Sequence, residues 1–290
     1  SFIVDLTAAT LVEVTVVTTP TNDTTPDYTF SSSEAGTITY PGSCSSDNTT
    51  ATTDNNTITL NSLSDGTHSN CAITVTDNAS NGVTLNISSF VIDTTAPTVS
   101  SVSSSTDNGS YKINDNITVT VTFNENVIVD NSSGNPRIQL ETGTNDRYAN
   151  YVSGNSTSIL SFLYTVQSGD NTTDLDYTST SSLSANNGTI QDNATNNANL
   201  TLLAPGSSGS LGANKDIVID TTAPTVSSIY PTDNQSDIPL TTDNISVTFS
   251  EAMDNTSITT NTDNTTCYGS FVLSSDNFSS CLQMSSSPSS

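Results

Sequence analysis

Short runs in which apolar and polar residues alternate recur along the whole chain. Examples are NITVTVTF at 116–123, NISVTF at 244–249, CAITVTD at 71–77 and NTITLNSL at 56–63. Alternation with a period of two places Ile, Val, Leu and Phe on one face of a strand and Thr, Ser or Asn on the other. No run with the helical period of 3.6 residues and capping signals competes with them. The pattern therefore predicts an all-β protein with small cores.

One phrase of nine residues, DTTAPTVSS, occurs at 93–101 and again at 220–228, each time behind the pair Val-Ile. The opening segment SFIVDLTAAT at 1–10 aligns with SFVIDTTAPT at 89–98, which makes it a third, degraded copy. The proline of the two full copies favours an extended residue before it and cannot continue a hydrogen-bonded ladder. The phrase is therefore predicted to separate domains.

Each copy of the phrase is followed by a strand that ends in Phe and then by a Glu. The linker Asp and this Glu are separated by 29, 32 and 31 residues in the pairs Asp5 to Glu34, Asp93 to Glu125 and Asp220 to Glu251. A spacing this constant indicates that the phrase marks a domain boundary and that the Glu lies in a fixed loop of each domain. The predicted domains span residues 1–93, 94–220 and 221–290.

The charge of the chain excludes some partners. It carries 29 acidic and 4 basic residues, for a net charge of -25. The basic residues Lys112, Arg137, Arg147 and Lys215 are too few and too scattered to neutralise a phosphate backbone, so we expect no nucleic-acid partner. An anionic membrane would repel the chain and no apolar run reaches membrane-spanning length, so we expect no direct membrane insertion. Cations are the favoured partners.

The four cysteines form two local pairs, Cys44 with Cys71 and Cys267 with Cys281. In a chain rich in Ser, Thr and Asn and poor in Lys, these pairs indicate disulfides formed in an oxidising, exported setting. Four unrelated buried thiols are the alternative, and metal ligation is disfavoured because no C-x-x-C is present. No enzymatic motif is found: G-x-S-x-G, H-E-x-x-H and a glycine-rich phosphate loop are all missing, so we expect no enzyme.

Longer stretches resemble a known family. They are LSDGTHSNCAITVTDNASNG in 1–93, VTVTFNENV and GTIQDNATNNA in 94–220, and PTDNQSDIPLTTDNISVTFSEAMD in 221–290. The chain resembles tandem bacterial immunoglobulin-like domains of large secreted surface proteins and adhesins, in which DTTAPT often joins modules. The resemblance implies immunoglobulin-like β-sandwiches in an extended array at the cell surface, with the third module incomplete. His68 stands where the first subtype usually has a Tyr, and packing is a more plausible role for it than catalysis.

In such a sandwich, the loop after the second strand and the loop between the last two strands lie at the pole where the chain enters. The resemblance therefore implies that Asp5 converges with Glu34 and Asp77, Asp93 with Glu125 and Asp192, and Asp220 with Glu251. Hard carboxylate oxygens without His or thiolate favour Ca²⁺, and similar modules of giant adhesins carry calcium at their junctions. Solvated loop carboxylates are the alternative. A further acidic stretch, with Asp170, Asp174 and Asp176, is interpreted as an exposed turn and strand edge, with a second cation site as the alternative.

These features favour a non-enzymatic extracellular stalk, stiffened by calcium at its linkers. The alternative is a filament subunit, because the first residues match a terminal strand and the last module lacks its final strands, so identical subunits could complete each other. An excerpt of a longer chain, with neighbouring modules in the same polypeptide, explains the same features. Asn-x-Ser/Thr triplets are candidate glycosylation sites, with ordinary loop chemistry as the alternative; they include Asn48, Asn86, Asn116, Asn171, Asn193, Asn244 and Asn277.

Overall fold

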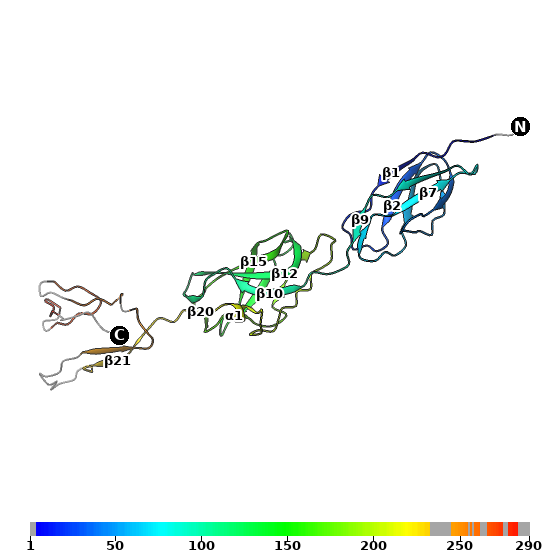
Figure 1. Cartoon of the computed structure of the whole chain (residues 1–290). Coiled ribbons are helices and arrows are strands. Elements are labelled where there is room, and N and C mark those ends of the chain that lie inside the picture. Colours follow the sequence, from blue (N-terminus) through cyan, green and yellow to red (C-terminus); the bar gives the residue numbers. More distant parts are fainter. Residues whose placement is uncertain are drawn as a thin grey trace. The chain divides into compact units, whose positions relative to one another are not determined.

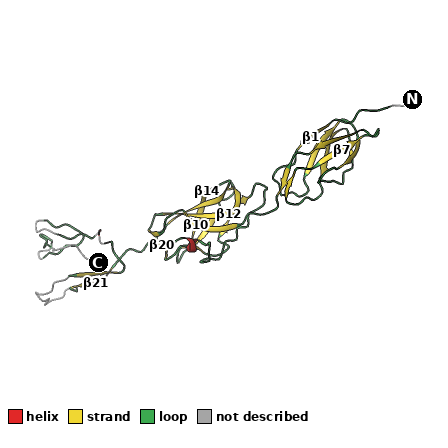
Figure 2. Ribbon diagram, viewed as in Figure 1, coloured by secondary structure: helices red, strands yellow, loops and turns green. Residues whose placement is uncertain are grey.

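The computed structural model describes residues 4–232, 245–254, 256, 258–261, 266–274 and 278–283. Strands make up nearly all of the regular structure in these residues, and the helix α1 (Leu211–Asn214) is about one turn long (Figure 2). The prediction of an all-β fold is therefore confirmed. The chain divides into two compact units, residues 1–221 and residues 222–290. The first unit contains two hydrophobic cores that share no residue.

The first core is enclosed by strands β1 to β9 (Figure 1). One sheet has the order β1-β2-β5, a second has the order β4-β3-β7-β8, and β6 pairs with β9. Alternation decides which side chains are buried: Tyr28 and Phe30 of β2 and Ile73 and Val75 of β7 are all inaccessible to solvent. This is an immunoglobulin-like sandwich. Its strands are β1 (Leu11–Thr15), β2 (Asp27–Ser32), β3 (Gly36–Thr39), β4 (Thr50–Ala51), β5 (Asp54–Thr59), β6 (Gly66–His68), β7 (Ala72–Thr76), β8 (Gly82–Asn86) and β9 (Phe90–Ile92).

The second core is enclosed by strands β10 to β20. The larger sheet has the order β10-β12-β15-β14-β13-β17, with β18 beside β13 and β19 beside β12, and the smaller one has the order β11-β20-β16. The strands are β10 (Val99–Ser104), β11 (Gly109–Tyr111), β12 (Asn116–Asp130), β13 (Arg137–Glu141), β14 (Arg147–Ser153), β15 (Thr157–Thr165), β16 (Asn171–Thr172), β17 (Asp176–Tyr177), β18 (Leu183–Ser184), β19 (Thr189–Gln191) and β20 (Ile217–Asp220).

The long strand β12 corrects one prediction. Its first part pairs with β10 and β15, its last three residues pair with β19, and its register to β15 is interrupted between Thr122 and Val127. Glu125 lies inside this interruption. The expected loop is found at Glu34, which follows β2, but in the second sandwich the Glu lies within a strand, because β12 continues from one pairing partner to the next.

The second compact unit contains β21 (Val226–Tyr230) and β22 (Ser246–Phe249), which pair antiparallel. The chain forms two disulfides, Cys44–Cys71 in the first core and Cys267–Cys281 in this unit. Both predicted pairings are therefore confirmed, and the alternative of four buried thiols is wrong. The incompleteness of the third module stays a prediction.

Candidate metal centres

Three carboxylates gather where the chain enters the first sandwich. Asp5 comes from the segment before β1, Glu34 follows β2, and Asp77 follows β7. One ligand oxygen of each lies within 4.8 Å of the others. The sequence predicts these three residues as one set, and the structure brings them together.

The turn between β7 and β8 holds this first cluster in shape. Asp77 Oδ1 accepts hydrogen bonds from the backbone N–H groups of Ala79 and Asn81, both at 2.8 Å. The Asn81 side-chain amide donates to Asp77 Oδ2 at 2.9 Å and to the Asp5 carbonyl at 3.2 Å. The amide of Asn81, followed by the backbone donors of the turn, holds the pKa of Asp77 below its usual value. Asn81 therefore orders the turn, joins it to the incoming chain and favours a charged Asp77.

The entrance to the second sandwich repeats this arrangement. Asp93, Glu125 and Asp192 each place one carboxylate oxygen within 4.8 Å of the others. Asn196 donates its backbone N–H to Asp192 Oδ1 at 2.8 Å and its side-chain amide to Asp192 Oδ2 at 2.7 Å and to the Asp93 carbonyl at 2.8 Å. The two turns have the sequences DNASN at 77–81 and DNATN at 192–196. This short repeat was the sequence signal for Asn81 and Asn196, whose roles the sequence prediction missed.

Negative charge accumulates at this second cluster. Asp192 is 3% exposed and Glu125 is half-buried. Burial, and then the charges of Asp192 and Asp93, raise the pKa of Glu125 above its usual value. Within the part of the chain that the structure describes, no ion pair of a lysine or arginine reaches either cluster. Hard oxygen ligands held this closely without a counter-charge are suited to a divalent cation such as Ca²⁺.

A pair of hydrogen bonds fixes the residue before the Glu in all three modules. In each case the partner is a threonine five residues after the linker Asp. The threonine N–H donates to the side chain of the residue before the Glu, and the threonine carbonyl accepts from the backbone N–H of that same residue. The distances from the threonine N to the side-chain oxygen are 2.8, 2.7 and 2.9 Å, and those from the backbone N to the threonine carbonyl oxygen are 3.0, 3.0 and 2.8 Å. The pairs are Thr10 with Ser33, Thr98 with Asn124, and Thr225 with Ser250.

The third predicted set stays a prediction. Asp220 ends β20 in the first compact unit, whereas Glu251 follows β22 in the second. Glu251 Oε1 is buried and has no hydrogen-bond partner among the described residues. The residue before Glu251 nevertheless makes the same pair of hydrogen bonds to a threonine as the residues before Glu34 and Glu125.

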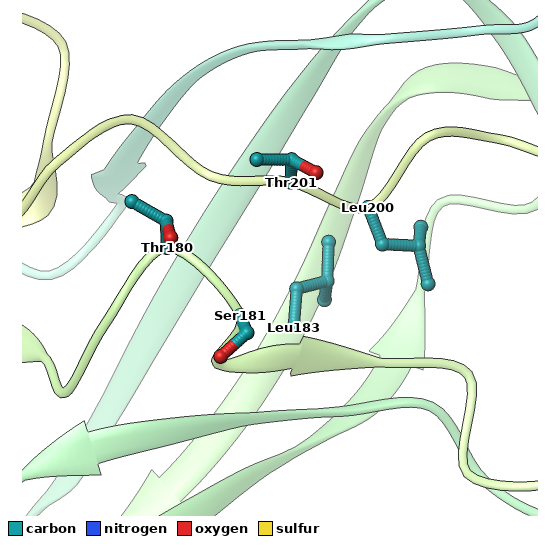
Figure 3. A pocket seen from close by; sticks show the side chains of 5 residues that line it. All are labelled: Thr180, Ser181, Leu183, Leu200 and Thr201. Atoms are coloured by element: carbon teal, nitrogen blue, oxygen red, sulfur yellow. The ribbon is translucent and has the colours of Figure 1, made fainter.

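Other candidate groups have structural roles or little chemistry. His68 Nε2 lies 2.9 Å from the Ser64 carbonyl, and its ring stacks on Phe90 with a centroid distance of 5.3 Å, as expected of a packed corner residue. Cys44 and Cys71 lie near this ring, but they are bonded to each other and are not available as ligands. A pocket of about 260 Å³ in the second sandwich contains no titratable side chain (Figure 3); it is lined by Thr180, Ser181, Leu183, Leu200 and Thr201.

The acidic stretch of the second sandwich is divided between two environments. Asp170 is fully buried: its carboxylate pairs with Arg147 Nε at 2.8 Å and accepts from the Tyr164 hydroxyl at 2.5 Å. Asp174 is exposed, and burial, followed by the charges of Asp216 and Asp176, raises its pKa. Asp170 was therefore wrongly read as part of an exposed turn, because its half-buried partner Arg147 lies 23 residues earlier and cannot be recognised from the local sequence.

The glycosylation candidates that the structure describes are all exposed. They are Asn48, Asn86, Asn116, Asn171 and Asn193. Asn244 and Asn277 lie outside the described residues. Glycosylation stays a prediction.

Comparison with known families identifies the class of the last module. The model of the bacterial Ig-like domain family matches residues 220–281. The chain therefore contains a bacterial Ig-like domain, and the resemblance inferred from the sequence is confirmed for this segment. A search of curated proteins finds no match to the chain. Within the described residues, no helix has the length and apolar character needed to cross a membrane.

Proposed function

We propose that this chain is a non-enzymatic, extracellular spacer of a bacterial surface protein, built from Ig-like modules whose entrances bind calcium. The match to a bacterial Ig-like domain supports a surface or adhesin-type role. The observation that carries the calcium part is the repeated cluster: a linker aspartate joins two carboxylates of the following sandwich within 4.8 Å in two successive modules.

The physical argument concerns the linker. A cation bound by Asp93, Glu125 and Asp192 would tie the linker to both the middle of β12 and the turn after β19. Without a cation the same three carboxylates repel each other: the pKa of Glu125 is raised first by burial and then by the charges of Asp192 and Asp93. Calcium would thus remove a repulsion and add a cross-link at one position, which restricts the linker.

The test compares the full chain in excess EDTA, in millimolar calcium and in millimolar magnesium. Calcium at 100 times its dissociation constant is expected to stabilise each loaded sandwich by about 2.7 kcal/mol, seen as higher transition temperatures in calorimetry. Small-angle scattering is expected to show reduced interdomain bending. Magnesium, which needs stricter octahedral geometry, is the control. Equal transition temperatures and equal scattering in EDTA and calcium would refute the calcium part of the proposal.

The filament alternative depends on the first residues and on the end of the last module. Residues 1–3 and 284–290 lie outside the described part of the chain. No observation on the described residues favours that alternative over the spacer.

A further inference from the structure

The linker between the two sandwiches, which begins at Asp93, is also held by the sandwich that precedes it. Asp65 Oδ1 accepts hydrogen bonds from the backbone N–H of Thr94 at 3.1 Å and from its hydroxyl at 2.8 Å. Asp65 Oδ2 accepts from the hydroxyls of Thr94 at 3.0 Å and Thr95 at 3.3 Å. The pairing of β6 with β9 brings these residues together, because Gly66 lies opposite Ile92. A single carboxylate of the first sandwich thus binds both threonines of the linker.

Asp93 lies between this contact and the second sandwich. Its N–H donates to the Thr21 carbonyl of the first sandwich at 2.9 Å. Its Oδ1 accepts from the Thr95 N–H at 3.0 Å, and its carbonyl accepts from Asn196 at 2.8 Å. Asp93 is therefore fixed on one side by the first sandwich and on the other by the turn that carries Asp192.

The corresponding threonine of the second linker is held in a similar way. Thr221 donates its hydroxyl to the Asp170 carbonyl at 2.9 Å and its N–H to Asn171 Oδ1 at 3.0 Å, while the Gly169 N–H donates to its hydroxyl at 3.1 Å. In the degraded first copy Leu6 takes this position and is 83% exposed. The threonine after the linker aspartate thus contacts the preceding sandwich at both full copies of the phrase.

We infer that Asp65 is a positioning residue for the second metal centre, which anchors Thr94 and thereby holds the neighbouring Asp93 beside Glu125 and Asp192. This inference deepens the proposed function, since it concerns the same cation site. Two consequences follow. The linker is ordered by Asp65 without any cation, and calcium binds the second cluster more tightly because Asp93 is already in place.

The corner residue His68 supports this anchor. Its Nε2 hydrogen bond ends on the carbonyl of Ser64, the residue directly before Asp65. Stacking on Phe90 of β9 places the same ring against the strand that leads into the linker. The turn that carries Asp65 is therefore fixed relative to β9 by contacts that do not involve the linker.

The experiment uses the full chain and the variants D65A, T94V and T94S, with D47A as a matched control because Asp47 is an exposed aspartate of the same sandwich. Hydrogen exchange in EDTA is measured by mass spectrometry for the peptide that contains residues 93–98. Exchange is expected to be about tenfold faster in D65A, the effect of losing a charge-assisted hydrogen bond. T94V is expected to give a smaller increase, and T94S and D47A to exchange like the wild type.

Calcium binding is then measured by titration calorimetry. D65A is expected to weaken one class of sites about tenfold, while the first cluster, Asp5, Glu34 and Asp77, binds as in the wild type. Wild-type exchange of the linker in D65A and T94V would overturn the anchor. Faster exchange with unchanged calcium affinity would overturn the positioning role. If the wild type binds no calcium, the positioning role and the proposed calcium function both fail, while the exchange in EDTA still decides whether Asp65 anchors the linker.

Discussion

Replacing Glu125 with glutamine is expected to change the stability of the second sandwich in opposite directions without and with calcium. Without a cation, the substitution removes a charge that two neighbouring carboxylates repel. With calcium, it removes a charged ligand. E125Q should therefore be more stable than the wild type in EDTA and gain less from calcium than the wild type does.

The size of the effect follows from the geometry. Oxygens of Asp93, Glu125 and Asp192 lie within 4.8 Å of one another. Two unit charges at that distance repel by about 3.5 kcal/mol at an effective dielectric constant of about 20, and by about 0.9 kcal/mol in bulk water. Because Glu125 is partly exposed, we take the lower end for each of its two pairs. E125Q is then expected to stabilise the metal-free sandwich by about 1 to 2 kcal/mol.

The sign of the pH dependence is also fixed. Because the pKa of Glu125 is raised in the folded protein, the folded state holds this proton more tightly than the unfolded chain. The resulting stability is present below the usual pKa of a glutamate and is lost as the pH rises through the raised folded-state pKa. E125Q should remove this part of the pH dependence in EDTA.

The assay is scanning calorimetry of the full chain in EDTA and in calcium, read at the transition of the second sandwich. D146N is the matched control, because it removes one charge from the exposed turn between β13 and β14 of the same sandwich. Two results would refute the reasoning: an E125Q protein less stable than the wild type in EDTA, or an E125Q protein that gains as much from calcium as the wild type.

Three further substitutions test the supporting structure. D170A is expected to lower the free energy of unfolding of the second sandwich by about 3 kcal/mol in urea unfolding, because it leaves the buried Tyr164 hydroxyl and the Gln167 N–H without their acceptor and removes the partner of Arg147. A loss below about 1 kcal/mol would contradict this. The double variant C44A/C71A should lower the free energy of unfolding of the first sandwich by about 3 kcal/mol, since the disulfide closes a loop of 27 residues. Reduction of the wild type should reproduce this loss. H68A is expected to lower the free energy of unfolding by about 1 to 2 kcal/mol and to speed amide exchange in the linker. Unchanged exchange would show that the contacts of His68 do not support the hydrogen bonds of Asp65 to the linker.

The sequence was sufficient for the fold class and for grouping the carboxylates of the first two clusters. Period-two alternation fixes the faces of strands such as β12, and the repeated phrase gives equivalent positions to Asp5 and Asp93. It was not sufficient for contacts that depend on strand pairing. Asp65 and Thr94 are 29 residues apart, and only the pairing of β6 with β9 makes them neighbours. The position of Glu125 within β12 likewise depends on β19, a partner more than 60 residues away.

The magnitudes decide how calcium acts at the second entrance. The repulsion of Asp93 by Glu125 and Asp192, two pairs at the lower end of the Coulomb range, is about 1 to 2 kcal/mol. It is opposed by the hydrogen bonds of Thr94 to the charged Asp65 carboxylate, which contribute about 1.5 to 3 kcal/mol, and by the hydrogen bond of Asn196 to the neutral carbonyl of Asp93, which contributes about 0.5 to 1.5 kcal/mol. The opposing contacts are at least as strong as the repulsion, so the three carboxylates stay together without a cation. Calcium should therefore bind to carboxylates that already lie together, rather than bring Asp93 to Glu125 and Asp192. When Asp65 is replaced, the position of Asp93 beside these two residues should depend on calcium.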